Sequence, residues 1–378
     1  MISPAQFDIA ADSAKGAAPG LDDPLLSREW FLIAWSSEVE LGRPLPRRAL
    51  GRDLVLWRSS QGLHCWLDLC IHRGARLSLG AIRMGSAPTG PNAAPGNTPD
   101  CLICPYHAWE YAPSGQCVRI PAHPGMTPPP KAHARVFAVR ERYGAVWVCL
   151  RNPEADPETG PESDPETDLP EFPFAETSGF RTVTAGPYRF RALGPRVVEN
   201  FLDVAHLGFV HAGLLGDPAR LEIDDYEVTD GPHGPVATEI RIWQPNPDGT
   251  GRGAVVTYRY WVAGPLTVGL EKVDSDRRFA ILAQVTPVDH ETSEMRMLMS
   301  INHGAQIHGA QIHGASIADA ELRAFQDTVA EQDRVVVESQ RPELLPLDLQ
   351  AELHLRSDRM AIAYRKWLRK IGLRYGAA

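Results

Sequence analysis

Apolar residues recur with two different periods along this chain, and the change from one to the other divides it into two parts. From Trp30 to about Leu150, short runs of β-branched and aromatic residues alternate with turn residues, for instance at 53–57 and 145–149. Runs of this length and composition, bounded by turns, are typical of strands. We therefore expect residues 28–151 to form an all-β domain.

In the C-terminal half, strand-like and helix-like patterns alternate. Residues 254–261 and 295–301 have the composition of strands, and the second run is expected to face a pocket or a core. Helices are expected at 197–209 and 358–370. A further long helix is predicted by apolar residues that recur near helical spacing, namely Leu322, Phe325, Val329, Val336 and Val337. The pattern thus predicts a mixed domain over residues 173–378.

Three stretches lack either period. Residues 1–27 are rich in Ala, Gly and Asp, whereas residues 152–172 are rich in Pro, Glu and Asp and contain Asp-Pro-Glu-Thr twice. A segment of that composition cannot bury a core, so we interpret 152–172 as a charged, mobile connection rather than a partner-binding tail. Residues 85–100, a Pro/Gly/Asn/Ala run, are expected to form a solvated loop between two strands.

A five-residue repeat, His-Gly-Ala-Gln-Ile, places histidines at positions 303, 308 and 313. A period of five matches neither one face of a helix nor one face of a strand. A metal-binding tract is one interpretation of His303, His308 and His313. We favour a duplicated flexible loop near the mouth of a binding site, because glycine follows each histidine.

Length and charge narrow the class of protein. At 378 residues the chain exceeds the usual size of a single core, which favours two domains. It has no run of eighteen apolar residues and no charged-then-apolar leader, so neither a membrane span nor secretion is expected. Its six cysteines form no disulfide framework, which suits a reducing cytoplasm. The net charge of −9, without a basic stripe, argues against a nucleic-acid partner.

Two short motifs together supply two thiolates and two imidazoles. These are Cys70-x-His72 and Cys104-x-x-His107. A Rieske-type cluster needs this set, because one of its irons is held by two Cys and the other by two His. A structural zinc site uses the same residue types at similar spacings, so the ligands alone leave both possibilities open.

Cys101 lies three residues before Cys104 and completes a Cys-x-x-Cys sequence. In isolation this spacing could indicate a redox-active dithiol. We favour the simpler interpretation that Cys101 lies on the strand that leads to the ligand loop, because Cys104 already belongs to the metal-binding set.

A second motif, Glu199-Asn-x-x-Asp203-x-x-His206-x4-His211, offers two imidazoles and a nearby carboxylate. Two His and one carboxylate suit a single catalytic iron, because such a triad leaves positions open for oxygen and substrate. Asp203 and His206 would share one helix face. His211 lies about 140° further around an ideal helix, so a break is required, and Gly208 is a plausible place for it. The alternative is an amphipathic core helix with satisfied histidines.

If Asp203 has another task, the third ligand of the iron, a carboxylate, has to come from elsewhere in the chain. Candidates late in the chain are Asp327, Asp333 and Glu338, within or next to the predicted long helix. For Asp333 the alternative is a surface carboxylate paired with Arg334.

These motifs resemble the oxygenase component of the Rieske non-haem iron oxygenases. The resemblance rests on Cys-x-His-Arg-Gly-Ala and Cys-Pro-Tyr-His-x-Trp, and on the stretches 120–124, 142–150, 331–334 and 357–368. It covers roughly residues 28–376, with gaps. It is greatest to the short-chain O- and N-demethylases of the vanillate and dicamba type and to the paralytic-shellfish-toxin hydroxylases. One departure is the 31 residues between His72 and Cys104, about twice the family's usual number.

The resemblance implies an α+β fold with a Rieske [2Fe-2S] domain at 28–151 and a catalytic mononuclear iron domain at 173–378. In the second domain an antiparallel sheet wraps around helices (a helix-grip, START-like arrangement), with the substrate pocket between sheet and iron. The implied cluster ligands are Cys70, His72, Cys104 and His107. The implied iron ligands are His206, His211 and Asp333, with Glu338 as the alternative to Asp333.

By the same resemblance, the protein is the terminal oxygenase of a multicomponent monooxygenase or dioxygenase. Electrons pass from NAD(P)H through a reductase, with or without a ferredoxin, and O2 is used to hydroxylate or demethylate a small aromatic or heterocyclic substrate. Three subunits form a ring, in which Asp203 bridges His206 and His107 of the neighbour. The alternative is that Asp203 is a helix-capping or structural acid.

A protein of another class would be a cluster-bearing electron carrier, or a zinc-structured binding protein, whose second domain only binds a ligand. That interpretation leaves Asp203, His206 and His211 unexplained. The chain contains neither a Gly-rich dinucleotide loop nor a second cluster motif, so the reductase is expected to be a separate protein.

Overall fold

The computed structural model describes residues 20–85, 99–151, 169–247, 252–274, 277–302 and 318–378. The segment 1–27, the insertion at 85–100, the connection at 152–172 and the repeat at 303–313 lie wholly or largely outside these residues. Among the described helices, none combines the length and the apolar character needed to span a membrane.

The N-terminal part is built almost entirely from antiparallel strands, after a short helix α1 (Pro24–Arg28). A six-stranded sheet has the order β1-β10-β9-β4-β3-β2, and a smaller sheet has the order β5-β6-β7-β8. The strands of the larger sheet are β1 (Trp30–Trp35), β2 (Leu45–Ala49), β3 (Arg52–Ser59), β4 (Gly62–Leu67), β9 (Val136–Arg142) and β10 (Ala145–Cys149). Those of the smaller sheet are β5 (Ala81–Arg83), β6 (Cys101–Ile103), β7 (Glu110–Tyr111) and β8 (Cys117–Arg119). The expectation of an all-β N-terminal part is confirmed.

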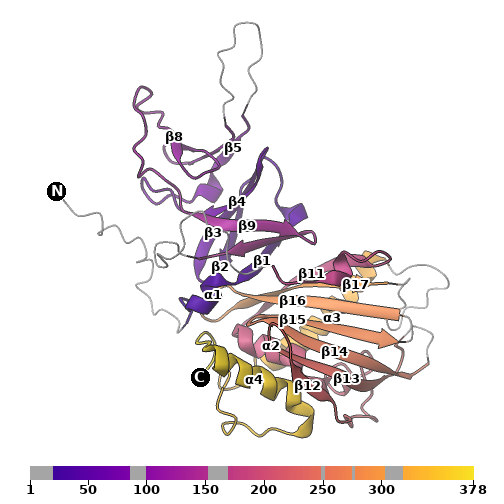
Figure 1. Ribbon diagram of the computed structural model, residues 1–378. Helices are drawn as coiled ribbons and strands as arrows, with labels where there is room; N and C mark the ends of the chain where they lie inside the picture. The colour runs from indigo at the N-terminus through magenta and orange to yellow at the C-terminus, as the bar shows by residue number, and fades with distance from the viewer. Residues whose placement is uncertain (1–19, 86–98, 152–168, 248–251, 275–276, 303–317) are drawn as a thin grey trace.

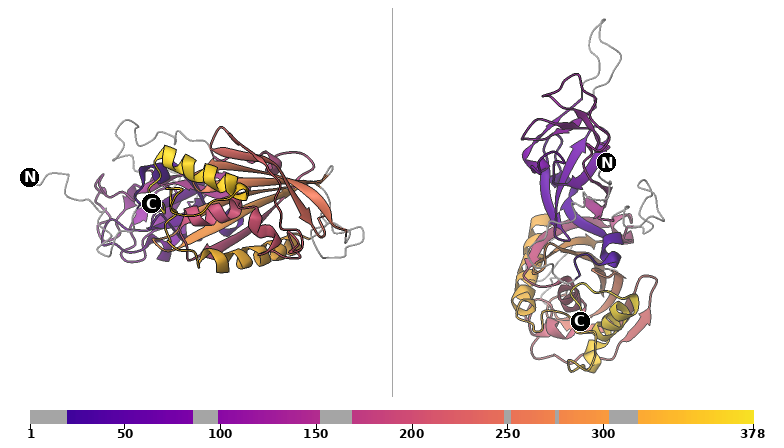
Figure 2. Two further views of the ribbon diagram at one scale, coloured as in Figure 1. Left: turned by 90° about the horizontal axis from the view of Figure 1, so that it is seen from below. Right: turned by 90° about the vertical axis from the view of Figure 1, so that its left-hand side faces the viewer.

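The C-terminal part contains one seven-stranded antiparallel sheet in the order β11-β17-β16-β15-β14-β13-β12. Its strands are β11 (Arg181–Phe190), β12 (Glu227–Asp230), β13 (Pro235–Gln244), β14 (Ala254–Gly264), β15 (Thr267–Asp274), β16 (Arg277–Pro287) and β17 (Ser293–Ile301). The main helices are α2 (Gly194–Leu202), α3 (Asp319–Val337) and α4 (Arg359–Ile371). The helices pack on one face of the sheet, with α2 between α3 and α4 (Figure 2). The predicted α+β architecture is confirmed.

The opposite face of this sheet carries the N-terminal part, with β1 lying against β16 (Figure 1). The side chain of Gln284 accepts a hydrogen bond from the Leu32 amide at 3.1 Å, and the Leu50 amide donates to the Pro287 carbonyl at 2.7 Å. Strands β16 and β17 are therefore buried on both faces over most of their length. One apolar core continues from the first part into the second, so the two parts form one body.

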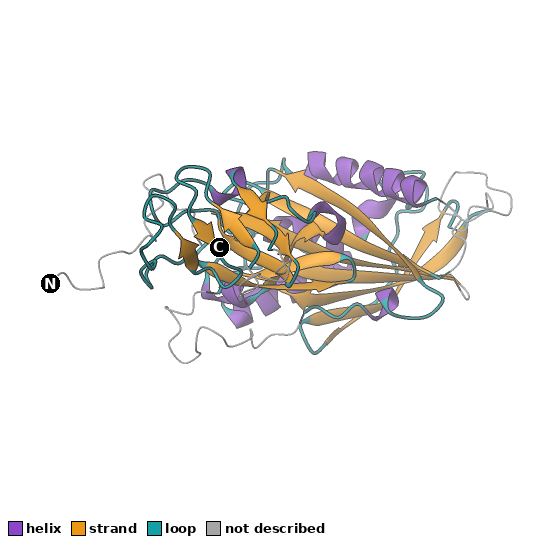
Figure 3. Ribbon diagram, turned by 90° about the horizontal axis from the view of Figure 1, so that it is seen from above, coloured by secondary structure: helices purple, strands orange, loops and turns teal. Residues whose placement is uncertain are grey.

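Among the described residues, strands are the main regular element of both parts, and the longest helix, α3, runs beside the C-terminal sheet (Figure 3). The long helix predicted from Leu322 to Val337 is confirmed by α3, and the predicted terminal helix by α4. The domain limits at 28–151 and 173–378 remain a prediction.

The helix expected at 197–209 differs from the observed structure. Helix α2 starts earlier, with Pro195 in its first turn, and ends at Leu202. Asp203 has extended backbone angles, and a separate turn of 3₁₀ helix, η5 (Ala205–Gly208), follows. The side chain of Asp203 accepts a hydrogen bond from the Ala205 amide at 2.8 Å, a local bond that competes with helix continuation. The break therefore occurs at Asp203 and not at Gly208.

Candidate metal centres

The four residues of the first motif lie on two facing loops. Cys70 and His72 follow strand β4, and Cys104 and His107 connect β6 to β7. Each loop is closed by its own backbone hydrogen bonds: the Gly74 amide donates to the Cys70 carbonyl at 2.9 Å, and the Cys104 amide donates to the Trp109 carbonyl at 2.9 Å. Gly74 has a φ of 70°, which suits glycine and lets the first loop turn sharply.

The thiols face inward and the imidazoles face outward. Cys70 and Cys104 are each 2% exposed, whereas His107 is an exposed residue. The ring centroids of His72 and His107 are 4.6 Å apart, and His72 stacks on Trp109 with an interplanar angle of 7°. Burial raises the pKa of the Cys104 thiol, and the adjacent Cys70 thiol raises it further. Two thiols are thus held together beneath the exposed imidazole of His107 and the partly buried imidazole of His72.

This arrangement fits a group that takes two sulfur and two nitrogen ligands. The buried Nδ1 of His72 has no hydrogen-bond partner among the described residues. Buried polar atoms of this kind are rare unless an unseen group satisfies them. A metal bond to Nδ1 would satisfy it, so the residues fit a two-iron cluster with mixed thiolate and imidazole ligation.

Tyr111 is a neighbour of the thiols that the sequence did not reveal. Its hydroxyl lies 3.1 Å from the Cys70 sulfur, and its ring packs edge-on against Trp66. Burial raises the pKa of Tyr111, so the phenol stays protonated and can donate to a thiolate. Hydrogen bonds to cluster sulfurs tune the reduction potential. An aromatic residue on a short strand carries no local signal of this role.

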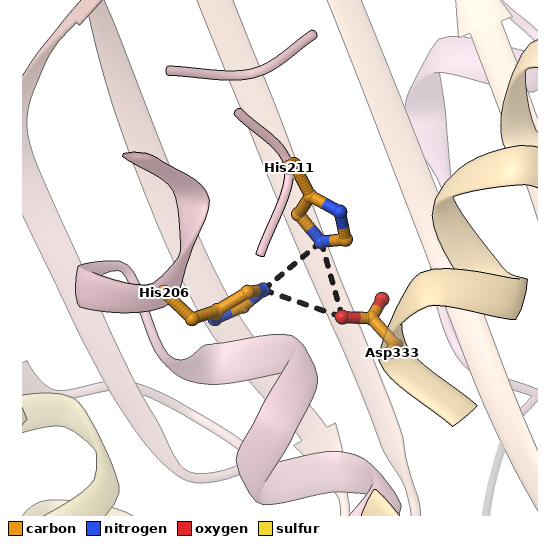
Figure 4. A group of neighbouring side chains, drawn as sticks. All are labelled: His206, His211 and Asp333. Carbon is orange, nitrogen blue, oxygen red and sulfur yellow. Dashed lines mark hydrogen bonds and ion pairs between the residues drawn. The ribbon is translucent and has the colours of Figure 1, made fainter. Parts of the chain in front are cut away.

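The second motif and helix α3 bring three ligand atoms together (Figure 4). Asp333 Oδ1 lies 3.0 Å from His211 Nε2 and 3.5 Å from His206 Nε2. The two Nε2 atoms are 3.2 Å apart. Ligand atoms about 2.1 Å from one metal and at right angles to each other are about 3.0 Å apart. The three atoms therefore fit one triangular face of an octahedral iron site.

The turn between the two histidines folds back on itself. The amides of Phe209 and Val210 both donate to the His206 carbonyl, at 3.0 and 2.8 Å. The backbones of Gly208 and Gly216 pack so closely that a Cβ at Gly216 would lie 2.5 Å from the Gly208 Cα. Glycine at these two positions thus permits the close crossing that places His211 opposite His206.

Each metal-site side chain has a hydrogen-bond partner that orients it. Asp203 Oδ2 lies 3.3 Å from His206 Nδ1, Gln332 Oε1 lies 2.8 Å from His211 Nδ1, and Asn200 Nδ2 lies 3.5 Å from Asp333 Oδ1. Neither Gln332 nor Asn200 has a role that the sequence pattern indicates. Asn200 lies within the second motif and Gln332 within the stretch 331–334, but side-chain direction cannot be read from spacing alone.

The pKa values around His206 follow from this pairing. Burial alone would raise the pKa of Asp203, but hydrogen bonds from His206 and from the Ala205 amide hold it below its ordinary value. Burial alone would lower the pKa of His206, but Asp203 and Asp333 raise it overall. Asp203 is therefore an ionised acceptor that fixes the orientation of the His206 ring.

The other candidate carboxylates lie outside this group. Glu338 accepts a hydrogen bond from the Arg191 amide at 2.9 Å and lies 3.7 Å from Arg334. Asp327 accepts a hydrogen bond from the Tyr188 hydroxyl at 2.8 Å. Of the three candidates, Asp333 is the one whose carboxylate meets the two histidines.

Cys101 lies on strand β6, as the preferred interpretation of the sequence predicts. The residue is buried, and burial raises the pKa of its thiol. A protonated, buried thiol is a poor nucleophile, which argues against a reactive dithiol.

Comparison with known proteins covers both parts of the chain. Residues 29–131 match the family model of the Rieske [2Fe-2S] domain, and residues 190–374 match that of the vanillate O-demethylase oxygenase C-terminal domain. The methylxanthine N1-demethylase NdmA of Pseudomonas putida is 28% identical over 354 residues, which are 90% of this chain and 88% of the relative. A relative named "Probable methylxanthine N7-demethylase NdmC", from Pseudomonas sp. (strain TJI-51), is 31% identical over 64% of this chain and 79% of its own length.

Solved structures agree with these matches. The structure of Pseudomonas putida CBB5 NdmA with caffeine superposes with a TM-score of 0.70 at 28% identity, over 92% of this chain and 91% of that chain. Dicamba monooxygenase with non-heme iron and dicamba superposes with a TM-score of 0.64 at 22% identity, over 92% of this chain and 97% of that chain. The second similarity is one of fold.

Proposed function

Because this chain belongs to the Rieske non-haem iron oxygenases, as a terminal oxygenase component with a [2Fe-2S] cluster and a mononuclear iron, we propose that it oxidatively demethylates a small aromatic or heterocyclic substrate. Cys70, His72, Cys104 and His107 hold the cluster, and His206, His211 and Asp333 hold the iron. When bound, the cluster passes on single electrons and the iron activates O2. The presence of two separate ligand sets in one chain is the observation that carries this proposal.

The residues around the iron ligands orient them and exclude water. His211 is 1% exposed, so its side of the site is sealed by protein. Asp203 accepts from His206 and leaves the Nε2 atom of that ring free to face the metal position. On the sheet side, Phe201 packs edge-on against the buried Tyr260 with ring centroids 6.1 Å apart, so this aromatic pair is part of the core that supports helix α2.

The substrate class rests on the relatives. NdmA is a methylxanthine demethylase, and its solved structure contains caffeine. Hydroxylation of an N- or O-methyl carbon gives a product that releases formaldehyde without further catalysis. Simple hydroxylation is the second candidate, since it uses the same C–H step and differs only in which carbon faces the iron.

The electron supply and the assembly are further parts of the proposal. Electrons come from NAD(P)H through a separate reductase, with or without a ferredoxin. Within one chain, the small sheet next to the cluster loops lies at the far end of the molecule from α2 and α3 (Figure 1). We therefore propose that a neighbour's cluster supplies the electrons, within the homotrimeric ring that the family resemblance implies.

Two exposed apolar side chains that are close to the iron ligands in sequence are compatible with such a neighbour. Phe209, between the two histidine ligands, is 74% exposed, and Val335, two residues after Asp333, is 66% exposed. A contiguous exposed apolar patch often marks an interface, and these two side chains are candidates for one. In the ring, His107 of one subunit would face Asp203 of the next.

Turnover with a surrogate reductase tests the function. Protein prepared anaerobically with iron should contain two sulfide-bridged irons and one extractable iron per chain. With NAD(P)H, reductase, O2 and a panel of N-methyl and O-methyl aromatic compounds, at least one substrate should release formaldehyde. A colourless protein that holds only zinc would contradict the proposal, and so would a reducible cluster without product from any compound that binds.

A further inference from the structure

The two histidines of the iron site are held by chemically different partners. His206 Nδ1 faces the Asp203 carboxylate at 3.3 Å, whereas His211 Nδ1 faces the neutral amide oxygen of Gln332 at 2.8 Å. The contact to Gln332 is the shorter one, and His211 is the more deeply buried ring, at 1% exposure. The less solvated ligand therefore depends on an uncharged acceptor.

The ring of His211 lies between two consecutive residues of α3. Its Nδ1 atom meets Gln332, and its Nε2 atom lies 3.0 Å from Asp333. Consecutive helical residues point about 100° apart and do not touch each other. A ring that reaches both side chains fills the angle between them, so one turn of α3 sets the position and the rotation of the imidazole.

The hydrogen bond to Gln332 also selects the tautomer of His211. An imidazole that binds a metal through Nε2 carries its proton on Nδ1. In a buried site that N–H needs an acceptor, which Gln332 Oε1 provides. With the amide turned around, its N–H would donate to Nδ1, the ring proton would move to Nε2, and the metal could not bind there.

We propose that Gln332 is a positioning residue that locks His211 in its metal-binding tautomer and aims Nε2 at the iron. This inference rests on the proposed iron site. It predicts that tight metal binding requires an acceptor oxygen at position 332. A variant whose side chain has a similar volume but lacks this oxygen should bind the metal more weakly.

Three variants separate the acceptor from the volume of the side chain. Gln332→Met keeps the length but removes the acceptor, and Gln332→Glu keeps an acceptor oxygen. Gln326→Met removes another buried amide of α3, six residues earlier, and serves as the matched control. The readouts are Fe(II) affinity by anaerobic equilibrium dialysis and the d–d absorption of bound Co(II), with the cluster absorbance as a check of folding.

We expect Gln332→Met to bind Fe(II) about 10- to 100-fold more weakly, with an altered Co(II) spectrum and an intact cluster. Gln332→Glu should bind within about threefold of the parent protein, and Gln326→Met should be unchanged. If the methionine variant does not fold, Gln332→Leu repeats the test.

Two results would overturn the role of Gln332: parent-like affinity in Gln332→Met, or equally weak binding in Gln332→Glu and Gln332→Met. His211→Ala, measured in parallel, separates this inference from the proposed function. If the parent protein binds Fe(II) no better than His211→Ala, the iron site itself is wrong, and the inference fails with it.

Discussion

Asp203 has a different partner on each of its carboxylate oxygens. Oδ1 accepts from the Ala205 amide at 2.8 Å and ends helix α2, and Oδ2 orients His206 at 3.3 Å. One residue thus serves as a local turn former and orients the histidine that we propose as an iron ligand. By our proposal its outward side also faces a neighbouring cluster.

Replacing Asp203 by Asn separates these roles. The amide oxygen can still accept from His206, so both metal centres should be retained, but the charge-assisted bond is lost. We expect substrate-dependent oxidation of the reduced cluster to slow by at least about 10- to 100-fold. Stopped-flow absorbance of the cluster measures this rate, and iron analysis is the control. A variant that keeps the parent rate would exclude Asp203 from the electron path.

Asp333 and Glu338 can be distinguished in the same way. Asp333→Ala removes the carboxylate that meets both histidines and should abolish the extractable iron, leaving the cluster spectrum intact. Glu338→Ala only removes contacts with the Arg191 amide and Arg334, so its iron content should match that of the parent. Iron analysis of both variants decides between them. Full iron in Asp333→Ala with loss in Glu338→Ala would reverse the assignment.

At the scale of elements, helix α2 is attached to α4 by buried charges. Arg365 donates two hydrogen bonds to Glu199, at 2.5 and 2.8 Å, and one to Glu352 at 2.5 Å. Arg196 donates to Glu352 at 2.9 Å and lies 3.6 Å from Glu199. Two positive and two negative side chains thus compensate each other beside the helix that leads to Asp203.

We expect Arg365→Met to reduce the free energy of unfolding by about 3–5 kcal/mol, because Glu199 is left buried without its main partner. The double variant Glu199→Met with Arg365→Met should recover part of this loss, since Arg196 and Glu352 still pair. Arg369→Met, on the exposed side of α4, should change stability by less than about 0.5 kcal/mol. Denaturant unfolding measures all three. Equal effects at positions 365 and 369 would show that the network does not stabilise the fold.

For the whole molecule, the decisive question is whether the cluster of one chain serves the iron of another. A cluster-deficient variant, Cys104→Ser, and an iron-deficient variant, Asp333→Ala, should each be inactive. Co-expressed in equal amounts and assembled randomly into rings, they should regain about one quarter of the parent activity. That fraction is the share of neighbouring pairs in which an intact cluster faces an intact iron site.

Sedimentation of each variant is the control for assembly. A strict monomer with full parent activity would contradict the ring. Mixed assemblies without any activity would show that each chain uses its own cluster.

Much of the architecture could be predicted from the sequence, because the signals are local. The strands around 53–57 and 145–149, the long helix ending at Val337 and the position of Cys101 on a strand follow from periodicity and turn residues. The two ligand motifs are also local, since each cluster loop contributes one Cys and one His within four residues. A metal-binding pair at short spacing is visible without any knowledge of the fold.

Tertiary structure decided which distant residues meet. The end of α2 at Asp203 depends on one side chain competing with the backbone, a balance that periodicity cannot reveal. Asp333 and Gln332 reach His211 across more than a hundred residues, and Glu199 and Arg365 are 166 positions apart. Such pairs exist because the sheet places α2, α3 and α4 on one face, since side-chain contacts between elements depend on packing and not on sequence spacing.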